Sequence, residues 1–184
     1  FGTDTGGRPV AKLIVIAIRN ILFLVFTTAL VSTIIGTLIG ILNGFVLNRE
    51  NPKYLIKIKN ISRLITSSIA NIPMLPLIFG VYLFNEFFIQ ENIIGLSSYQ
   101  KCMISFIILG LIYFSTILAI SVENHIINLN KLEFLSAAEG LGVPIIKIVF
   151  DHIIKTNLGA VLIPQILLIG IQVIFLEITL SFDN

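Results

Sequence analysis

Four long stretches of this chain contain no aspartate, glutamate, lysine or arginine, and they constrain the fold more than any other feature. The stretches run over residues 20–48, 64–85, 102–122 and 156–176. Each is close to or above the ~20 residues that a helix needs to cross a bilayer. Because 56% of the residues are hydrophobic and only 12% are charged, a water-soluble fold would lack the polar surface to cover its core. The sequence therefore predicts an all-α, polytopic helical membrane protein.

The predicted chain is a single transmembrane domain over residues 1–184. It holds about four spans, each built on one of the charge-free stretches. The predicted spans are residues 20–48, 64–85, 102–122 and 156–180.

The charges between the spans predict which side of the membrane each connection faces. Residues 49–63 carry five basic residues against one glutamate, whereas residues 86–101 carry two glutamates against one lysine. Basic residues accumulate in short cytoplasmic loops. This places 49–63 inside and 86–101 outside, and it makes 123–155 cytoplasmic. Both chain ends are then outside, with residues 1–19 as an external lead-in, although three basic residues in this lead-in run against the rule.

Small residues recur at every fourth position of the first span, at Ser32, Gly36, Gly40 and Gly44. Residues four apart lie on the same face of a helix. A stripe of small residues lets another helix backbone approach closely, which is how helices associate in lipid. We expect this stripe to be a helix-packing surface.

Polar and helix-breaking residues in the second and fourth spans are candidates for lining a pathway. Asn71 and Pro73 lie in the second span, where proline removes a backbone donor and favours a kink or break. Gln165, Gln172 and Glu177 lie in the fourth, and an ionisable residue in or near a span is a functional candidate. A structural kink, and a Glu177 solvated at the outer end, remain open alternatives.

The connection over residues 123–155 has the pattern of two short helices outside the membrane. Asn130 can cap a helix, with Glu133 three residues later as in a capping box. Gly142 and Pro144 then predict that this helix stops. The apolar face of such a helix rests either on lipid or on a partner protein, and the spacing alone does not decide between them.

Four separated motifs resemble one family of membrane proteins. The opening Gly2-Thr3-Asp4-Thr5-Gly6-Gly7-Arg8 is similar to its Gly-Thr-Asp-x-x-Gly-Arg-Asp signature, and the Gly36–Gly44 stripe is similar to its next span. The connection resembles its Glu-Ala-Ala-x-x-x-Gly pattern, with Ser136 in place of the glutamate, and residues 177–182 resemble its Glu-x-x-Leu-Ser-Phe element. The family is the permeases of the dipeptide, oligopeptide and nickel class of ABC importers, of the C type.

The resemblance implies an ABC importer type I transmembrane domain whose residues 123–155 contain a cytoplasmic coupling helix. The residues that would couple it to an ATPase are Glu133, Ser136, Ala137, Ala138 and Gly142. Family members carry a further span before and after this region, so the chain resembles a fragment that lacks the first and last spans.

The same resemblance implies partners and a location. Nucleotide-binding ATPase subunits, a second permease subunit, an extracellular or periplasmic substrate-binding protein and the lipid bilayer are expected, in a bacterial inner membrane; nucleic acid is not. No phosphate-binding Gly-x-x-x-x-Gly-Lys-Ser/Thr sequence occurs in the chain. We therefore expect a transporter subunit and not an enzyme, with no cofactor or metal of its own, and with ATP and magnesium on the partner.

Two alternatives remain open at this point. The same architecture could import nickel or another small solute instead of peptides. A channel or scaffold subunit of another membrane complex could share the spans and the stripe, but it would not need an ATPase-docking segment.

Overall fold

A computed structural model describes most of the chain, and it is helical. The described residues are 2–3, 6–46, 53–73, 76–77, 79–80, 83, 98–129, 137–138, 140–144, 147–148, 151, 154–155 and 158–181. Within these residues there is no strand, and the nearest approach to one is an isolated bridge between Thr3 and Pro9. The prediction of an all-α polytopic membrane protein is confirmed.

Long helices account for nearly all of the described chain. They are α1 (Val10–Ile41), α2 (Lys53–Ala70), α4 (Ser98–Leu109), α5 (Ser115–Leu129) and α8 (Gly159–Ser181). Two π-helical segments extend or join them: η1 (Leu42–Val46) continues α1, and η3 (Gly110–Phe114) links α4 to α5. The chain therefore passes from α4 to α5 without leaving the helix axis, as a single span.

Three of these helices are long and apolar enough to cross a membrane: Val10–Gly44, Met103–Leu129 and Gly159–Ile178. They coincide with the first, third and fourth predicted spans. The second predicted span, 64–85, falls on the end of α2 and on residues that the structure describes only in part. It stays a prediction.

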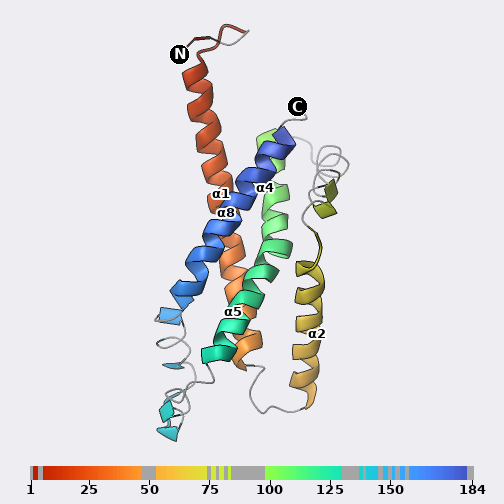
Figure 1. Ribbon diagram of the computed structural model, residues 1–184, viewed down its shortest axis with the longest axis vertical. Helices are drawn as coiled ribbons and strands as arrows, with labels where there is room; N and C mark the ends of the chain where they lie inside the picture. Colours follow the sequence, from red (N-terminus) through yellow and green to blue (C-terminus); the bar gives the residue numbers. More distant parts are fainter. Residues whose placement is uncertain are drawn as a thin grey trace.

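The first helix begins earlier than the charge pattern suggested. Pro9, with φ −66°, stands at its N-cap, and α1 then runs through Lys12 and Arg19 without interruption. Its 32 residues make it about 48 Å long at 1.5 Å per residue. That exceeds the ~30 Å thickness of a bilayer core, and its N-terminal part stands clear of the other helices (Figure 1).

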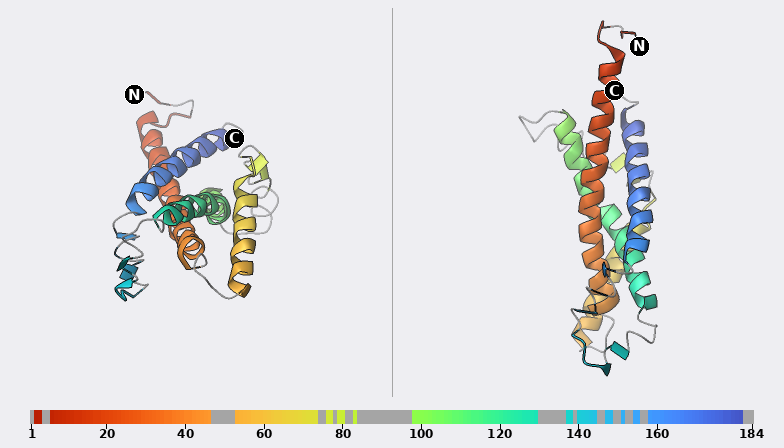
Figure 2. Two further views of the ribbon diagram at one scale, coloured as in Figure 1. Left: turned by 60° about the horizontal axis from the view of Figure 1, so that its bottom comes forward. Right: turned by 90° about the vertical axis from the view of Figure 1, so that its left-hand side faces the viewer.

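The helices run up and down in a bundle. In Figure 1, α1 and α5 descend, whereas α2 and α8 ascend, so that both chain ends lie at the same end of the molecule. Two further views show α8 crossing α1 on one side of α5, with α2 on the other side (Figure 2). The described parts of residues 137–155 lie at the opposite end from the termini. This arrangement agrees with the alternation predicted from charge.

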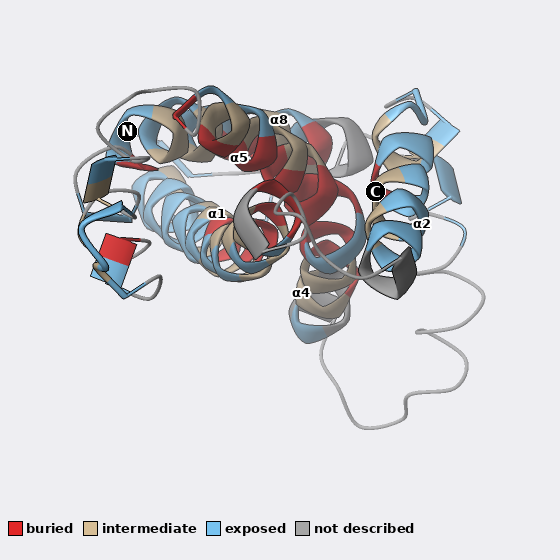
Figure 3. Ribbon diagram, turned by 90° about the horizontal axis from the view of Figure 1, so that it is seen from below, coloured by how far each residue is buried: buried red, intermediate tan, exposed pale blue. Residues whose placement is uncertain are grey.

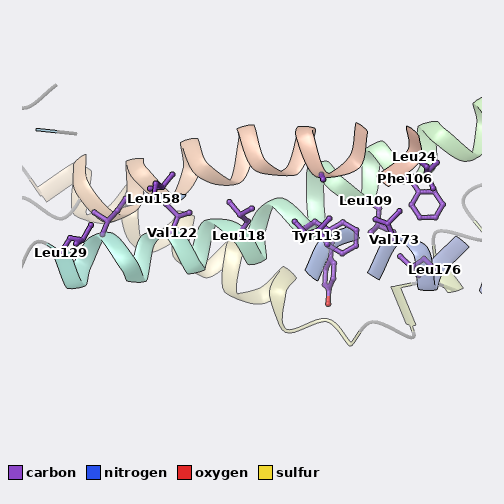
Figure 4. Close-up of a cluster of buried hydrophobic side chains, with 14 of the residues drawn as sticks. Leu24, Phe106, Leu109, Tyr113, Leu118, Val122, Leu129, Leu158, Val173 and Leu176 are labelled. Carbon is purple, nitrogen blue, oxygen red and sulfur yellow. The ribbon is translucent and has the colours of Figure 1, made fainter. Parts of the chain in front are cut away.

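The core surrounds α5. Its side chains Leu118, Val122 and Ile126 have no solvent exposure, and α8 contributes Val173, which is also fully buried. Seen along the bundle, burial concentrates on α5 and on the faces of α1 and α8 turned towards it (Figure 3). Figure 4 shows the row of buried side chains that extends from Tyr113 of η3 along α5 to Leu129. The central helix is thus enclosed, while the outer faces of α1 and α8 expose large apolar side chains, as helices in lipid do.

Candidate functional site

The stripe of small residues on α1 lies directly against α5. A Cβ atom added at Gly36 would stand 2.7 Å from the carbonyl oxygen of Ser115, and one at Gly40 would stand 2.6 Å from Cβ of Val122. At Gly44 the closest atom would be Cβ of Ile126, at 3.0 Å. Real Cβ atoms do not come closer than about 3.0 Å, so only glycine permits this approach at Gly36 and Gly40.

The order of these contacts fixes the relative direction of the two helices. From Gly36 to Gly44 along α1, the contacted residues advance from Ser115 to Ile126 along α5. The helices are therefore parallel, and the connection after α1 begins at the same end of the bundle at which α5 finishes. The described parts of residues 49–63 and 123–155, both predicted to be cytoplasmic, share that end.

The stripe begins at a π-helical segment of the partner helix. The Ser32 hydroxyl donates to the carbonyl oxygen of Thr28 at 2.6 Å and lies 3.3 Å from that of Gly110, the first residue of η3. A Cβ at Gly110 would meet Ser32 Oγ and Thr28 Cγ2 at 3.1 Å. A π-helical segment frees backbone carbonyls and often marks a functional region. Here the Ser32 hydroxyl of α1 reaches the carbonyl oxygen of Gly110 in η3.

An ion pair connects α2 to α5. The Arg63 Nε–H donates to Glu123 Oε1. The Glu123 side chain is only 7% exposed, whereas that of Arg63 is 39% exposed. Glu123 lies about 9 Å before the end of α5, counted along the helix axis. A carboxylate at this depth needs a partner, because a buried unpaired charge is strongly unfavourable.

A second cation lies near this pair. Burial lowers the pKa of Lys59 below its usual 10.5, and the positive charge of Arg63 lowers it further, while the Glu123 carboxylate acts in the opposite direction. Desolvation disfavours the charged amine and a like charge adds to this. Beside the Glu123 carboxylate, the α2–α5 junction therefore disfavours a positive charge on Lys59 in addition to that of Arg63.

Clefts lie on both sides of the α2–α5 junction, because α2 meets the bundle along a narrow line. Thr66 is the one buried side chain of α2 between residues 56 and 70. A polar cleft of about 710 Å³ contains the Arg63–Glu123 pair. Its polar lining residues are Asn60, Arg63, Thr66, Ser67, Glu123 and Asn124. A second cleft of about 500 Å³ is mainly apolar and lies among α2, α5 and Ile39 of α1.

The predicted stop at Gly142 is confirmed in atomic detail. Gly142 has φ +76°, and the Val143 N–H donates to the carbonyl oxygen of Ala138 at 3.1 Å. This six-to-one bond with a left-handed glycine is a Schellman motif. A new helical turn follows at once, since Lys147 and Ile148 donate their N–H groups to the carbonyl of Pro144 at 2.9 and 3.1 Å. The described residues on either side of Gly142 are therefore joined by a defined turn.

The two faces of this segment differ. Ala138 and Val143 pack against the core cluster, whereas Ala137 is exposed and the Leu141 side chain is 84% exposed. Leu141 is the most exposed of the large apolar side chains that the structure describes. Of the residues expected to couple to an ATPase, Glu133 and Ser136 lie outside the described residues.

The pathway candidates lie apart from the two clefts at the α2–α5 junction. α2 ends at Ala70, and Asn71 and Pro73 follow as an exposed turn, so the expected interruption is present. Gln165, Gln172 and Glu177 are half-buried on α8. Neither of the two clefts described above is lined by any of these residues. Their role in a pathway stays a prediction.

Sequence reasoning missed the Arg63–Glu123 pair. It counted Arg63 among the basic residues that mark the cytoplasmic side, and it used Glu123 only as the start of the connection over residues 123–155. The sequence did contain a signal for this pair. Glu123 directly follows the charge-free stretch 102–122, and Arg63 directly precedes the charge-free stretch 64–85. Among the described residues, no group of three or more potential metal ligands lies together.

Comparison with known proteins gives one match over the whole chain. The sequence is 28% identical over 187 residues to the dipeptide transport system permease protein DppC of Lactococcus lactis subsp. cremoris (strain MG1363). The match covers 100% of this chain but 47% of that protein, so the chain spans about half the length of this relative. No protein-family model matches the sequence, and no solved structure matches it significantly. The similarity supports a relationship to the ABC permeases.

Proposed function

We propose that this chain forms the membrane-spanning core of an ABC importer permease that moves peptides across a bacterial cell membrane. The observation that carries the proposal is the similarity to a dipeptide permease along the full length of the chain. The parallel α1–α5 pair and the helical bundle with a turned segment at one end are consistent with it.

The segment around Gly142 is the proposed docking site for a nucleotide-binding subunit. Its inner side, at Ala138 and Val143, is held by the bundle, and its outer side presents Ala137 and Leu141. An apolar side chain that is 84% exposed suits insertion into a groove of a partner protein. Because the Schellman motif fixes the turn, a force on Leu141 would pass to the bundle through Ala138 and Val143 without being absorbed at the joint.

ATP binding and hydrolysis belong to the partner in this proposal. Closure of the ATPase pair moves the docking segment as a rigid body, and the helices that continue from it, α5 before it and α8 after it, change their tilt. A second permease and a substrate-binding protein complete the proposed assembly. Peptides are the proposed solute because the matched relative is a dipeptide transport permease.

The docking proposal is tested with Leu141→Asp. Because this side chain makes little contact with its own chain, the substitution should leave the amount of folded protein in the membrane unchanged. It should reduce co-purification of the nucleotide-binding subunit, and ATP-driven dipeptide uptake by reconstituted vesicles should fall about tenfold or more. The matched control is Leu141→Ala, which shortens the same side chain but keeps the surface uncharged. Leu167→Asp would not serve as a control, because that charge would face lipid.

Two results would contradict the proposal in different ways. Normal uptake by Leu141→Asp would remove the docking assignment while leaving the importer intact. If the assembled wild-type protein took up no dipeptide but did take up nickel or another small solute, the peptide assignment would fall. A protein that conducts solute without any nucleotide-binding subunit would be a channel.

A further inference from the structure

The polar cleft between α2 and α5 combines opposite charges with uncharged hydrogen-bonding groups. Its volume is about 710 Å³, and six of its eight lining residues are polar or charged. The two charges are those of Arg63 and Glu123, which bind each other. In a chain with only 12% charged residues, the polar face of the amphipathic helix α2 here meets a buried glutamate at the end of the apolar span of α5.

The cleft does not suit a position against lipid tails. Polar groups without water or protein partners are unfavourable in hydrocarbon, and ionisable residues in membrane helices almost always face a protein interior or a water-filled cavity. The side of α2 that carries Ile58, Ile61 and Ile65 borders the apolar cleft instead. The helix thus separates an apolar side from a side lined mostly by polar residues, and we expect the latter to face water.

The two charges differ in mobility. Glu123 is 7% exposed and is held by α5 against the α1 stripe, where its carbonyl oxygen would stand 3.1 Å from a Cβ at Gly44. Arg63 is 39% exposed and has a long side chain. The guanidinium can therefore move away from the carboxylate, while the carboxylate stays in place. Such a pair can open to admit a molecule between its two members.

The chemistry of the pair specifies what that molecule would be. A guanidinium binds a carboxylate through two parallel N–H donors, and a carboxylate binds an ammonium group by charge-assisted hydrogen bonds. A ligand with both groups would replace one ion pair by two, without leaving either residue unpaired. Asn60 and Asn124 add amide donors and acceptors that match a peptide bond. Two residues of extended chain span about 7 Å, and the cleft has a volume of about 710 Å³.

We propose that this cleft is a contact site for a small zwitterion such as a dipeptide, in which Glu123 binds the ammonium group and Arg63 binds the carboxylate. The proposal rests on the proposed function for its transport role. Without ligand, Arg63 and Glu123 neutralise each other, as the structure shows. The cleft lies towards the end of the bundle that holds the docking segment, so in the proposed importer it would meet the solute on the side of release.

The test uses the full-length protein with its partner subunits in nanodiscs, without a substrate-binding protein. Binding of alanyl-alanine, of N-acetyl-alanyl-alanine and of alanyl-alanine amide is measured by saturation-transfer NMR. Blocking either end should weaken binding to the wild type about tenfold, because each end loses one charge-assisted interaction. In Glu123→Gln, the acetylated and free peptides should bind equally well. In Arg63→Gln, the amide and the free peptide should bind equally well.

Two variants guard against a folding defect. Arg63→Lys keeps the positive charge beside Glu123 but loses the planar fork, and it should retain the preference for a free carboxylate with weaker binding. Lys57→Gln removes an exposed charge of α2 that does not line the cleft, and it should bind all three probes as the wild type does.

A purely structural ion pair would give a different pattern. Both neutralising variants would then change stability while all three probes kept the same relative affinities, which would overturn the site. ATP-driven uptake of alanyl-alanine by the same complex, supplied with its binding protein, tests the proposed function separately. Uptake without the probe pattern rejects the cleft alone, and absent uptake of any peptide rejects the peptide importer.

Discussion

The closest approach between α1 and α5 gives the most quantitative test of the fold. A Cβ at Gly40 would lie 2.6 Å from Val122 Cβ, 2.7 Å from Val122 Cγ1 and 2.8 Å from the Ala119 carbonyl oxygen. Carbon atoms pack best at about 3.5–4.0 Å. Gly40→Ala therefore forces the two helices apart by about 1 Å, and a gap of that size forfeits a quarter to a half of each neighbouring contact.

The expected loss follows from two opposing effects. Overpacking of this kind costs about 1–3 kcal/mol, whereas replacing a helical glycine with alanine gains up to about 1 kcal/mol from helix propensity. Gly170→Ala on α8 is the matched control, because its Cβ would meet only Val25 Cγ1, at 3.4 Å. The difference between the two variants cancels the propensity gain. Gly40→Ala should therefore be about 1–3 kcal/mol less stable than Gly170→Ala.

The assay is reversible unfolding of the purified protein in mixed micelles, followed by helical circular dichroism as the denaturing detergent increases. A second comparison sharpens it. Val122→Ala removes Cγ1 but leaves Cβ and the Ala119 carbonyl in place, so it should rescue Gly40→Ala only slightly. Equal free energies of unfolding for Gly40→Ala and Gly170→Ala, within about 0.5 kcal/mol, would refute the close parallel packing.

Three further predictions concern the α2–α5 junction and the docking segment. Arg63→Met leaves the buried Glu123 unpaired and should lower the free energy of unfolding by about 1–3 kcal/mol, and the double variant Arg63→Met/Glu123→Met should recover most of this loss. Burial and Arg63 lower the pKa of Lys59 in the folded protein, so the charged lysine destabilises the fold slightly at pH 7, and Lys59→Gln should unfold there at the same or a slightly higher temperature than the wild type. Just below pH 10.5 the unfolded wild-type chain binds more protons than the folded one. The stability of the wild type relative to Lys59→Gln should therefore increase as the pH rises towards that value. Gly142→Ala strains a residue at φ +76° and should destabilise the turn by about 1–2 kcal/mol, measured by hydrogen exchange at Val143, whereas the helical Gly140→Ala should not.

The sequence was informative wherever one local rule decides the structure. Charge-free stretches predict apolar helices because hydrocarbon admits no unsatisfied backbone, and three of the four stretches coincide with such helices. The Gly36–Gly44 stripe predicts a close helix contact, since small residues at every fourth position have no other common use in lipid. Gly142 before Pro144 predicts a helix stop because few other residue pairs end a helix so definitely.

Other features depend on partners that no local pattern reveals. The stripe does not say which helix it meets, and its contact with Ser115 to Ile126 arises only in the folded bundle. The first span was predicted to begin at residue 20, whereas α1 begins at Val10. Lys12 and Arg19 end the charge-free stretch, but charged side chains do not interrupt the backbone hydrogen bonds of a helix. The π-helical segment at Gly110 likewise reflects a tertiary contact, with Ser32 and Thr28, and not a sequence signal.

The parallel packing of α1 on α5 explains why the missed ion pair lies where it does. Because the two helices run in the same direction, Gly44 of η1, which continues α1, meets the backbone of Glu123 near the end of α5. The chain then reverses into α2, which returns alongside α5 and brings Arg63 to the same carboxylate. Glu123 is thereby fixed by α1 and neutralised by α2, on the helix that leads into the docking segment. Glu123 is the one acidic or basic residue (Asp, Glu, Lys or Arg) of α5. A movement of the docking segment that is passed along α5 should therefore act on this charge, and we expect the polar cleft to open together with that movement.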